Sequence, residues 1–431
     1  MWRSITLRNF KLFDEQGVAV DLRPVTVLIG ANGAGKSSVL QALALLKQSK
    51  ASQTLILQGP HLNLGSYRDV AHNQNEDLRM GIEVSADYAP ADSDIAEIHP
   101  MFDAGSFDYK AEFVRGGALQ THSGTLNGER DIVLQGEWDA RVASPTFPLP
   151  MREGIGYQLA PIQQISIPFQ INSVSVPPDD YLWTRVTEQL ISRLHTVFSL
   201  LEKTYLVPPI RGLDRPSYGV LPGIPELDYP AGWGPESQAT YVVNAFAYQP
   251  ELSAHVARYL QEVLGPDALQ IRPRLAPNQQ VSAETFVEGI NINLVNEAFG
   301  LNQLLLPLIG FARAGEGSVI TIEEPEIHLH PKAQVALCGL FVELVKARRG
   351  QLILTTHSEH IIIGLLNAVT ARRLPSTEIS IYEFSRVNQT TRARRLEVNE
   401  FGQISGGLKG FMDVDIESLN DYLNSRFGQR E

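Results

Sequence analysis

The residues whose spacing indicates a defined chemistry lie near the start of the chain, at Gly30-Ala31-Asn32-Gly33-Ala34-Gly35-Lys36-Ser37. They fit the phosphate-binding pattern G-x-x-x-x-G-K-[ST], in which glycines allow a tight turn whose N–H groups point at phosphate oxygens. We expect Lys36 to reach the β- and γ-phosphates of ATP, Ser37 to bind Mg²⁺, and Asn32 to offer its amide to the γ-phosphate. The predicted nucleotide-binding residues are Gly30, Asn32, Gly33, Ala34, Gly35, Lys36, Ser37 and Ser38.

A pair of adjacent carboxylates forms the second candidate group. Val319-Ile320-Thr321-Ile322 is typical of a buried strand, and Glu323 and Glu324 follow it directly. We expect this strand to lie beside the strand that precedes the P-loop, with Glu323 at the metal and Glu324 as the general base. Aspartate is more common than glutamate at the position of Glu323. Without the P-loop, the same pair would indicate only a solvated turn.

Two further segments contain histidines that could take part in the chemistry. Gln351-Leu352-Ile353-Leu354-Thr355-Thr356-His357 predicts a strand that ends at a histidine, and His357 could therefore sense the γ-phosphate or hold the attacking water. His328 and His330 have a spacing seen in zinc sites, but no cysteine or histidine cluster accompanies them. We favour a nucleotide-interface loop for this pair.

The elements that must position these groups are visible as local patterns. Val25–Ile29 is a β-branched apolar run and residues 38–46 favour a helix, which is the strand–loop–helix order that a P-loop requires. Arg8 or Lys11 could contact the nucleotide, or they could belong to a solvated loop. Further strands are predicted at residues 4–7, 18–22, 78–84, 109–114 and 132–138, and helices at 182–203 and 250–264. No sustained heptad pattern predicts a long coiled coil.

Composition narrows the class of protein. The 431 residues carry a formal net charge of −12, so the surface as a whole should repel nucleic acid, and DNA binding would need a local basic patch. The single cysteine, Cys338, excludes an internal disulfide, and its apolar neighbours favour a buried helix position. No apolar stretch has the length of a membrane span and no signal peptide is apparent, which predicts a cytoplasmic protein without membrane contact.

Three segments together resemble the ABC-type ATPase heads of OLD (overcoming lysogenization defect) proteins, which are relatives of SMC-like and recombination-repair ATPases. These segments are G-A-N-G-A-G-K-S, I-T-I-E-E-P-E-I-H-L-H-P and L-T-T-H-S-E-H. The segment from Tyr205 to Arg211 and the closing segments 398–404 and 410–413 are also similar to that group. The resemblance is dense over residues 1–70 and 290–411. It implies an α/β fold with a mainly parallel core sheet flanked by helices, an antiparallel β lobe, and an inserted α+β region in place of a long coiled coil.

The resemblance also implies how the chain is divided. Residues 1–75 would form the N-terminal half of the head, 76–180 a β-rich lobe, 181–290 a helical and loop insertion, and 291–431 the C-terminal half. Such heads pair head to tail, so that each ATP lies between a P-loop and the partner's signature loop. The matching signature residues are Gly300, Asn302 and Gln303, although the usual L-S-G-G-Q is altered and its serine is missing. His357 matches the switch histidine, and Gln58 is the candidate for the Q-loop glutamine.

The sequence is compatible with three functions. The first is an ATPase that forms a homodimer through its ATP sites, or a higher homo-oligomer, and controls a separately encoded effector such as a nuclease or toxin in anti-phage defence. The second is a repair-type ATPase that contacts DNA directly, which the net charge and the missing coiled coil disfavour. The third is an ATP-binding scaffold with little turnover. We expect that no Toprim-like domain follows the head, we count a phage component among the expected partners, and we interpret Asp413 and Asp415 as structural.

Overall fold

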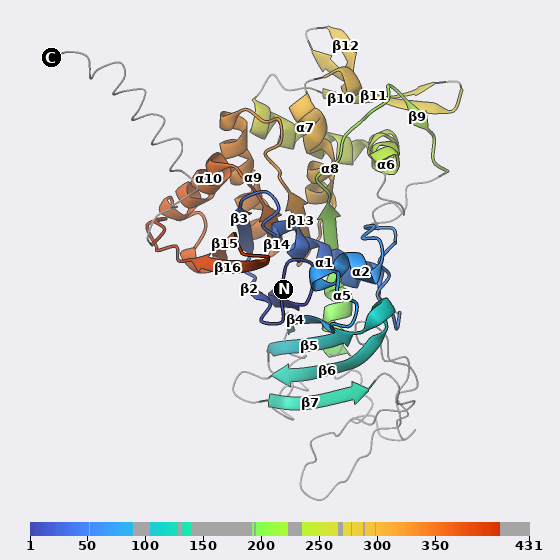
Figure 1. Ribbon diagram of the computed structural model, residues 1–431. Coiled ribbons are helices and arrows are strands. Elements are labelled where there is room, and N and C mark those ends of the chain that lie inside the picture. The colour runs from blue at the N-terminus through green and yellow to red at the C-terminus, as the bar shows by residue number, and fades with distance from the viewer. Residues whose placement is uncertain are drawn as a thin grey trace, which may run out of the picture.

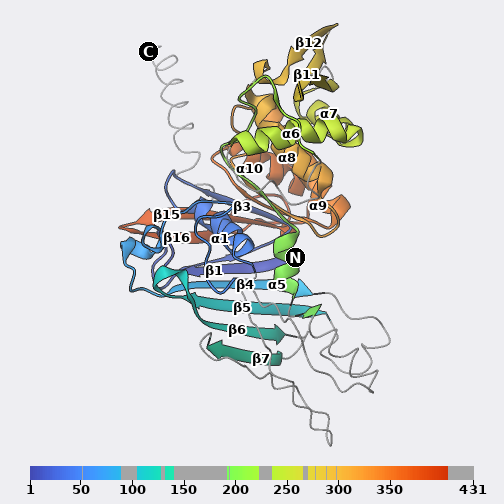
Figure 2. The ribbon, with the colours of Figure 1, turned by 90° about the vertical axis from the view of Figure 1, so that its right-hand side faces the viewer.

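The computed structural model describes residues 1–50, 52–88, 104–127, 132–139, 192–193, 195–222, 235–265, 270–276, 278–287, 289–297 and 299–405. Within these ranges the chain has a mixed α/β fold in layers, with a mainly parallel sheet between two hydrophobic cores and an antiparallel sheet below it (Figures 1 and 2). The predicted α/β fold class, with a parallel core sheet and an antiparallel β lobe, is confirmed.

The parallel sheet carries the predicted site. Its strand order is β16-β15-β3-β14-β13-β8, and every neighbouring pair is parallel except β15 and β16. The strands are β3 (Val25–Gly30), β8 (Thr204–Val207), β13 (Val319–Glu323), β14 (Gln351–Thr355), β15 (Ile379–Val387) and β16 (Thr390–Leu396). All six residues of β3 are buried, as expected for a strand covered on both faces.

Helices cover the two faces of this sheet unequally. Along β3, Val25, Val27 and Ile29 join the core shared with the helices above, whereas Leu28 joins the core around α1 below. The upper layer contains α8 (Phe299–Arg313), α9 (Pro331–Arg348) and α10 (Glu359–Thr370), and the lower layer contains α1 (Lys36–Gln48) and α5 (Thr196–Glu202) (Figure 2). The alternation of side chains along each strand thus ties both layers to the P-loop strand.

The antiparallel sheet has the order β2-β1-β4-β5-β6-β7 and forms the lower end of the molecule in Figure 1. Its strands are β1 (Trp2–Arg8), β2 (Val18–Asp21), β4 (Met80–Tyr88), β5 (Gly105–Phe113), β6 (Leu119–Asn127) and β7 (Ile132–Asp139). Alternate residues of β4–β6 are buried against α1 and α5 in one core, which explains the alternating pattern of their sequences.

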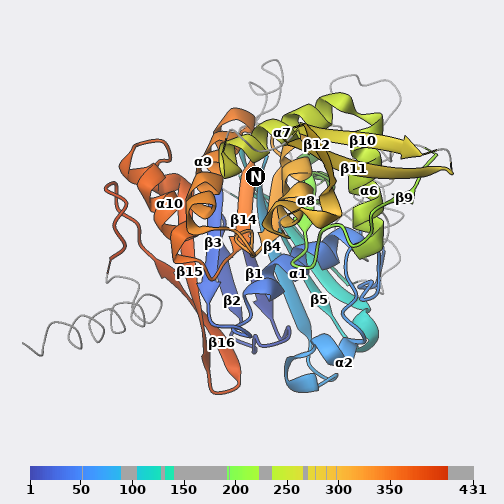
Figure 3. The same cartoon turned by 90° about the horizontal axis from the view of Figure 1, so that it is seen from above.

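The remaining elements lie at the opposite end. Helices α6 (Pro235–Tyr248) and α7 (Pro250–Leu264) pack on α8 and α9 beside a small sheet of β9 (Tyr218–Gly219), β10 (Gln270–Ala276), β11 (Gln280–Val287) and β12 (Ile290–Asn293) (Figure 3). The short helix α2 (Tyr67–Val70) lies against the segment that follows β1, since its Val70 carbonyl accepts a hydrogen bond from the Lys11 N–H at 2.7 Å.

One expectation about strand order was wrong. Strand β13, which ends at Glu323, does not lie beside the P-loop strand β3, because β14 pairs with both and separates them. The predicted helix over 250–264 coincides with α7. Of the predicted helix 182–203, the structure describes α5 at Thr196–Glu202 and leaves most of the rest outside the described residues.

Candidate functional site

The P-loop is shaped by glycines in backbone conformations that are unfavourable for other residues. Gly30, Gly33 and Gly35 have φ values of +139°, +72° and +95°, a region that strains residues with a side chain. At Gly30 a Cβ atom would also come within 2.2 Å of the Phe384 carbonyl oxygen of β15. The loop leads from β3 into the first turn of α1, which contains no acidic residue and whose N–H groups could therefore bind an anion.

Lys36 connects the P-loop to the neighbouring strand end. Its Nζ donates hydrogen bonds to the carbonyl oxygens of Gly30 at 2.8 Å and Ala31 at 3.0 Å, and it lies 2.9 Å from His357 Nε2. Burial lowers the pKa of Lys36, while the nearby Glu324, Glu326 and Glu323 oppose that effect. The side chain thus places an ammonium group over the loop, where a phosphate would bind.

His357 follows β14 and lies between the lysine and the second carboxylate. Its Nε2 is 3.7 Å from Glu324 Oε1. Burial, followed by the positive charge of Lys36, lowers the pKa of His357. The neutral imidazole can accept a hydrogen bond from Lys36, and it brings Lys36, Glu324 and His357 into one cluster.

Ser37 and Glu323 meet directly. The Ser37 hydroxyl donates a hydrogen bond to Glu323 Oε2, although the two residues are 286 positions apart. Burial raises the pKa of Glu323, so a bound divalent cation would relieve the cost of its charge. Hydroxyl and carboxylate oxygens are ligands that Mg²⁺ accepts, and these residues therefore fit the predicted metal.

Glu326 is a buried carboxylate that the sequence analysis did not single out. Its Oε1 accepts hydrogen bonds from Thr356 Oγ1 at 2.6 Å and from the His357 backbone N–H at 2.8 Å. Burial raises its pKa. Glu326 thus fixes the chain direction at His357, and its position in E-E-P-E was the available signal.

Arg211, at the end of the segment that begins at Tyr205, also belongs to the site, although the sequence predicted no separate role for it. It is 5% exposed, and its guanidinium donates to the backbone carbonyl oxygens of Glu323 and Glu324, each at 2.9 Å. Burial lowers its pKa to about 10, so it stays charged at neutral pH.

The signature residues lie at the start of α8. Asn302 is buried, donates to the Leu213 carbonyl at 2.9 Å and accepts from the Leu213 N–H at 2.7 Å. Gln303 is also buried and donates to the Arg211 carbonyl. At Gly300, a Cβ atom would lie 2.4 Å from the His328 carbonyl oxygen. In this conformation both amides are therefore engaged within the chain, and their predicted contact with a partner's nucleotide stays a prediction.

Other expected contacts have different partners. Arg8 is bonded to Glu83 of the antiparallel sheet, whereas Lys11 is bonded to Gln41 of α1 and lies close enough to Glu323 to interact with its charge. Gln58 is exposed and donates to the Gly65 carbonyl at 3.2 Å. Asn32 is exposed at the mouth of the loop.

The loop after the carboxylates and the tail were also interpreted from the sequence. The ring of His330 accepts a hydrogen bond from the Lys332 N–H and caps the start of α9. Among the described residues, no group of three His, Cys, Asp or Glu side chains could hold a metal ion. Asp413, Asp415 and the segment 410–413 lie outside the described residues.

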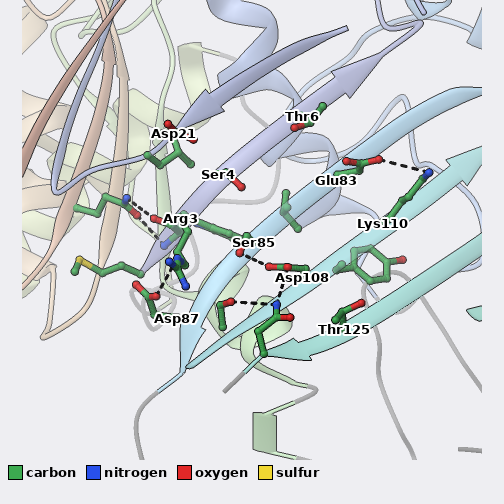
Figure 4. Close-up of a pocket in the computed structure, with 18 of the residues that line it drawn as sticks. Arg3, Ser4, Thr6, Asp21, Glu83, Ser85, Asp87, Asp108, Lys110 and Thr125 are labelled. Carbon is green, nitrogen blue, oxygen red and sulfur yellow. Dashed lines mark hydrogen bonds and ion pairs between the residues drawn. The ribbon is translucent and has the colours of Figure 1, made fainter. Parts of the chain in front are cut away.

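A wide hollow of about 880 Å³ lies elsewhere, on the antiparallel sheet (Figure 4). Its charged groups pair with one another, as in Arg3 with Asp87 at 3.5 Å and Lys110 with Glu83 at 3.6 Å. None of the predicted site residues lines this hollow. The chemistry therefore gathers at the strand ends of the parallel sheet and not in the hollow.

Comparison with known proteins agrees with the P-loop geometry. A family model described as "AAA ATPase domain" matches residues 1–112 and 249–362, which is more than half of the chain. The chain belongs to this family. The matched ranges of the AAA ATPase domain include the P-loop, Glu323, Glu324 and His357. No curated protein matches the sequence.

Solved structures of SMC heads also match, at low identity. The SMC head bound to the C-winged helix domain of ScpA is 12% identical, with a TM-score of 0.45 and coverage of 92% of this chain and 98% of that one. The SMC head domain from Thermotoga maritima is 12% identical, with a TM-score of 0.42 and coverage of 92% and 99%. An SMC head with an extended coiled coil, bound to the C-terminal domain of ScpA derived from Pyrococcus furiosus, is 11% identical, with a TM-score of 0.45 and coverage of 98% and 99%. At such scores these matches carry no conclusion about activity or partners.

In the described part of the chain, no helix is both long enough and apolar enough to cross a bilayer.

Proposed function

We propose that this protein binds and hydrolyses ATP as an ABC-type ATPase, and that nucleotide-dependent head-to-tail association of two copies controls an effector. The observation that carries the proposal is the convergence of Lys36, Ser37, Glu323, Glu324 and His357 from three separate segments of the chain. The P-loop, the acidic strand end and the histidine all follow strands whose registers align Leu28, Thr355 and Glu323 across the sheet.

The proposed roles follow from chemistry and position. The P-loop N–H groups and Lys36 would bind the phosphates, and Lys36 would offset charge as the terminal phosphate is transferred. Mg²⁺, held through Ser37 and Glu323, would supply charge neutralisation at the phosphate oxygens. Glu324 would accept the proton of the attacking water, and neutral His357 would hold that water or the γ-phosphate by a hydrogen bond.

The proposed association rests on the resemblance to OLD-type heads. In such a dimer, Gly300, Asn302 and Gln303 of one copy would face the ATP of the other, and the nucleotide would act as part of the interface. The effector would be a separately encoded nuclease or toxin in anti-phage defence, and the location would be the cytoplasm. The choice of effector rests on analogy with the family and on no residue of this chain.

A specific observation favours a second candidate, an ATP-binding scaffold with little turnover. The amides of Asn302 and Gln303 are bonded to the backbone of residues 211–213 within the chain, and they would have to exchange these bonds before contacting a partner's nucleotide. If that exchange is unfavourable, ATP would bind and hydrolysis would be slow.

Steady-state ATP hydrolysis by Glu324→Gln separates these functions. We expect kcat to fall by at least about 100-fold, the usual effect of losing a general base, with ATP binding retained. Glu316→Gln is the matched control, because Glu316 is an exposed carboxylate that pairs with Arg349 on the surface. Unchanged turnover in Glu324→Gln would show that the base is misassigned. Negligible turnover by the wild-type assembly would favour the scaffold.

Association and DNA binding need separate measurements. ATP-bound Glu324→Gln should dimerise in light scattering, and Lys36→Ala should stay monomeric under the same conditions. Salt-sensitive DNA binding by the purified chain alone would favour the repair-type ATPase over the effector hypothesis. Co-purification of the product of the neighbouring gene would identify the effector.

A further inference from the structure

In the described part of the chain, the guanidinium of Arg211 donates its hydrogen bonds to backbone carbonyl oxygens. Nε donates to the Gln303 carbonyl at 2.9 Å, and Nη1 donates to the carbonyls of Pro208 at 2.8 Å and Glu323 at 2.9 Å. Nη2 donates to the Glu324 carbonyl at 2.9 Å. A buried cation is costly, and here it is compensated by four hydrogen bonds and by the negative charges of nearby Glu326, Glu324 and Glu323.

The carbonyls of Glu323 and Glu324 belong to a turn that needs support. Glu324 has a φ of +46°, a left-handed conformation that is unfavourable for a residue with a side chain. Its N–H donates to the Thr355 carbonyl at 3.0 Å, and its own carbonyl accepts from Arg211. The backbone of Glu324 is therefore held from β14 on one side and from Arg211 on the other, which fixes where its carboxylate emerges.

The same segment is tied to the start of α8. The Arg211 carbonyl accepts from the Gln303 side chain, and the Leu213 backbone exchanges two hydrogen bonds with the Asn302 amide. Gly212, between them, has a φ of +117°, and a Cβ atom there would lie 2.9 Å from Gln303 Nε2. Movement of α8 would therefore be transmitted through residues 211–213 to the turn that carries Glu324.

We propose that Arg211 is a positioning residue of the ATPase reaction, which joins the signature helix α8 to the Glu323–Glu324 turn and sets the position of the general base. This inference rests on the proposed function. Arg211 would thus connect the signature residues of α8, which are expected to contact the partner's nucleotide, with the general base of its own copy. Arg211 acts through the backbone of Glu324 and does not itself contact the nucleotide.

Arg211→Lys is the most direct test, because it keeps the positive charge and loses the planar fork. A lysine ammonium cannot reproduce donors spread over carbonyls of both α8 and the turn. We expect kcat to fall by about 10- to 100-fold, as for a displacement of the base by about 1 Å, while KM and the ATP dissociation constant change by less than about twofold. Arg394→Lys is the control, since Arg394 forms an exposed pair with Glu383 on the sheet.

A role in the fold alone would give a different result. If Arg211 served only stability, turnover per folded nucleotide site, counted with a fluorescent ATP analogue, would equal that of the wild type. That result would overturn the inference. Arg211→Gln provides a second variant of similar length without charge, for which the same kcat loss with retained binding is expected.

Two further outcomes would also contradict a proposal: misfolding of both Arg211 variants, and a wild type that does not hydrolyse ATP. If neither variant folds by circular dichroism, Arg211 belongs to the fold and the inference is wrong. If the wild type itself does not hydrolyse ATP, the proposed function fails before Arg211 is tested, and the two failures are thereby distinguished.

Discussion

A buried histidine in the antiparallel sheet should make the protein sensitive to mild acid. His122 of β6 is 3% exposed, and its ring lies 6.1 Å from that of Tyr109 in an edge-to-face arrangement. Burial lowers the pKa of His122 from 6.5 to about 4. The unfolded chain therefore binds this proton below pH 6.5 more readily than the folded chain does, so stability is complete above pH 6.5 and declines as the pH falls toward 4.

The magnitude follows from the difference of about 2.5 pH units between the two pKa values, at 1.36 kcal/mol per unit. The full loss, reached below pH 4, is about 3 kcal/mol, and at pH 5 the loss from this single group is about 2 kcal/mol. The free energy of unfolding of the wild type should therefore fall between pH 7.5 and pH 5. In His122→Leu we expect this fall to be smaller by about 2 kcal/mol.

Urea unfolding at both pH values, followed by tryptophan fluorescence and circular dichroism, measures this difference. His255→Leu, at an exposed position of α7, controls for the loss of a histidine as such. The same pH dependence in the wild type and in His122→Leu would refute the reasoning, because it would show that His122 does not stay neutral in the folded sheet.

Further predictions concern the site and the core. Lys36→Ala should weaken ATP binding by at least about 100-fold, because it removes a buried charge from the phosphate position, and unchanged affinity in titration calorimetry would disprove the P-loop assignment. Ser37→Ala should raise the Mg²⁺ concentration for half-maximal hydrolysis by about tenfold, with Ser52→Ala, at an exposed loop, as the control; equal Mg²⁺ dependence would separate Ser37 from the metal. Phe341→Ala should lower the free energy of unfolding by about 3–5 kcal/mol, because the ring is fully buried against Phe311, whereas Phe401→Ala, with 63% exposure, should change it little.

The sequence predicted the chemical groups of the site because their signals are local. Gly30 to Ser37 are contiguous, Glu323 and Glu324 lie at the end of the apolar run of β13, and His357 lies two residues after β14. In parallel strands such positions meet at one edge of the sheet, so their convergence could be expected without knowledge of the strand order. The helix at 250–264 was likewise marked by a first-turn proline and a terminal glycine.

The order of the strands had no such local signal. β3, β13 and β14 are all short apolar runs of similar length, and each could occupy either side of the others. Which strand is central depends on how α8, α9 and α10 pack across the sheet, and that packing involves residues far apart in the sequence. The expectation that β13 lies beside β3 was wrong for this reason.

The roles of Arg211 and Glu326 could not be predicted from the sequence, because both residues bind mainly backbone groups. Arg211 binds carbonyl oxygens, and a carbonyl oxygen is present at every residue, so no partner residue type reveals the interaction in advance. Glu326 binds a threonine hydroxyl and a backbone N–H, a group that every residue except proline carries. The predicted groups would contact nucleotide, metal or water, whereas these two hold the backbone that carries them. For that reason Arg211→Lys should separate turnover from ATP binding, while Lys36→Ala should remove both.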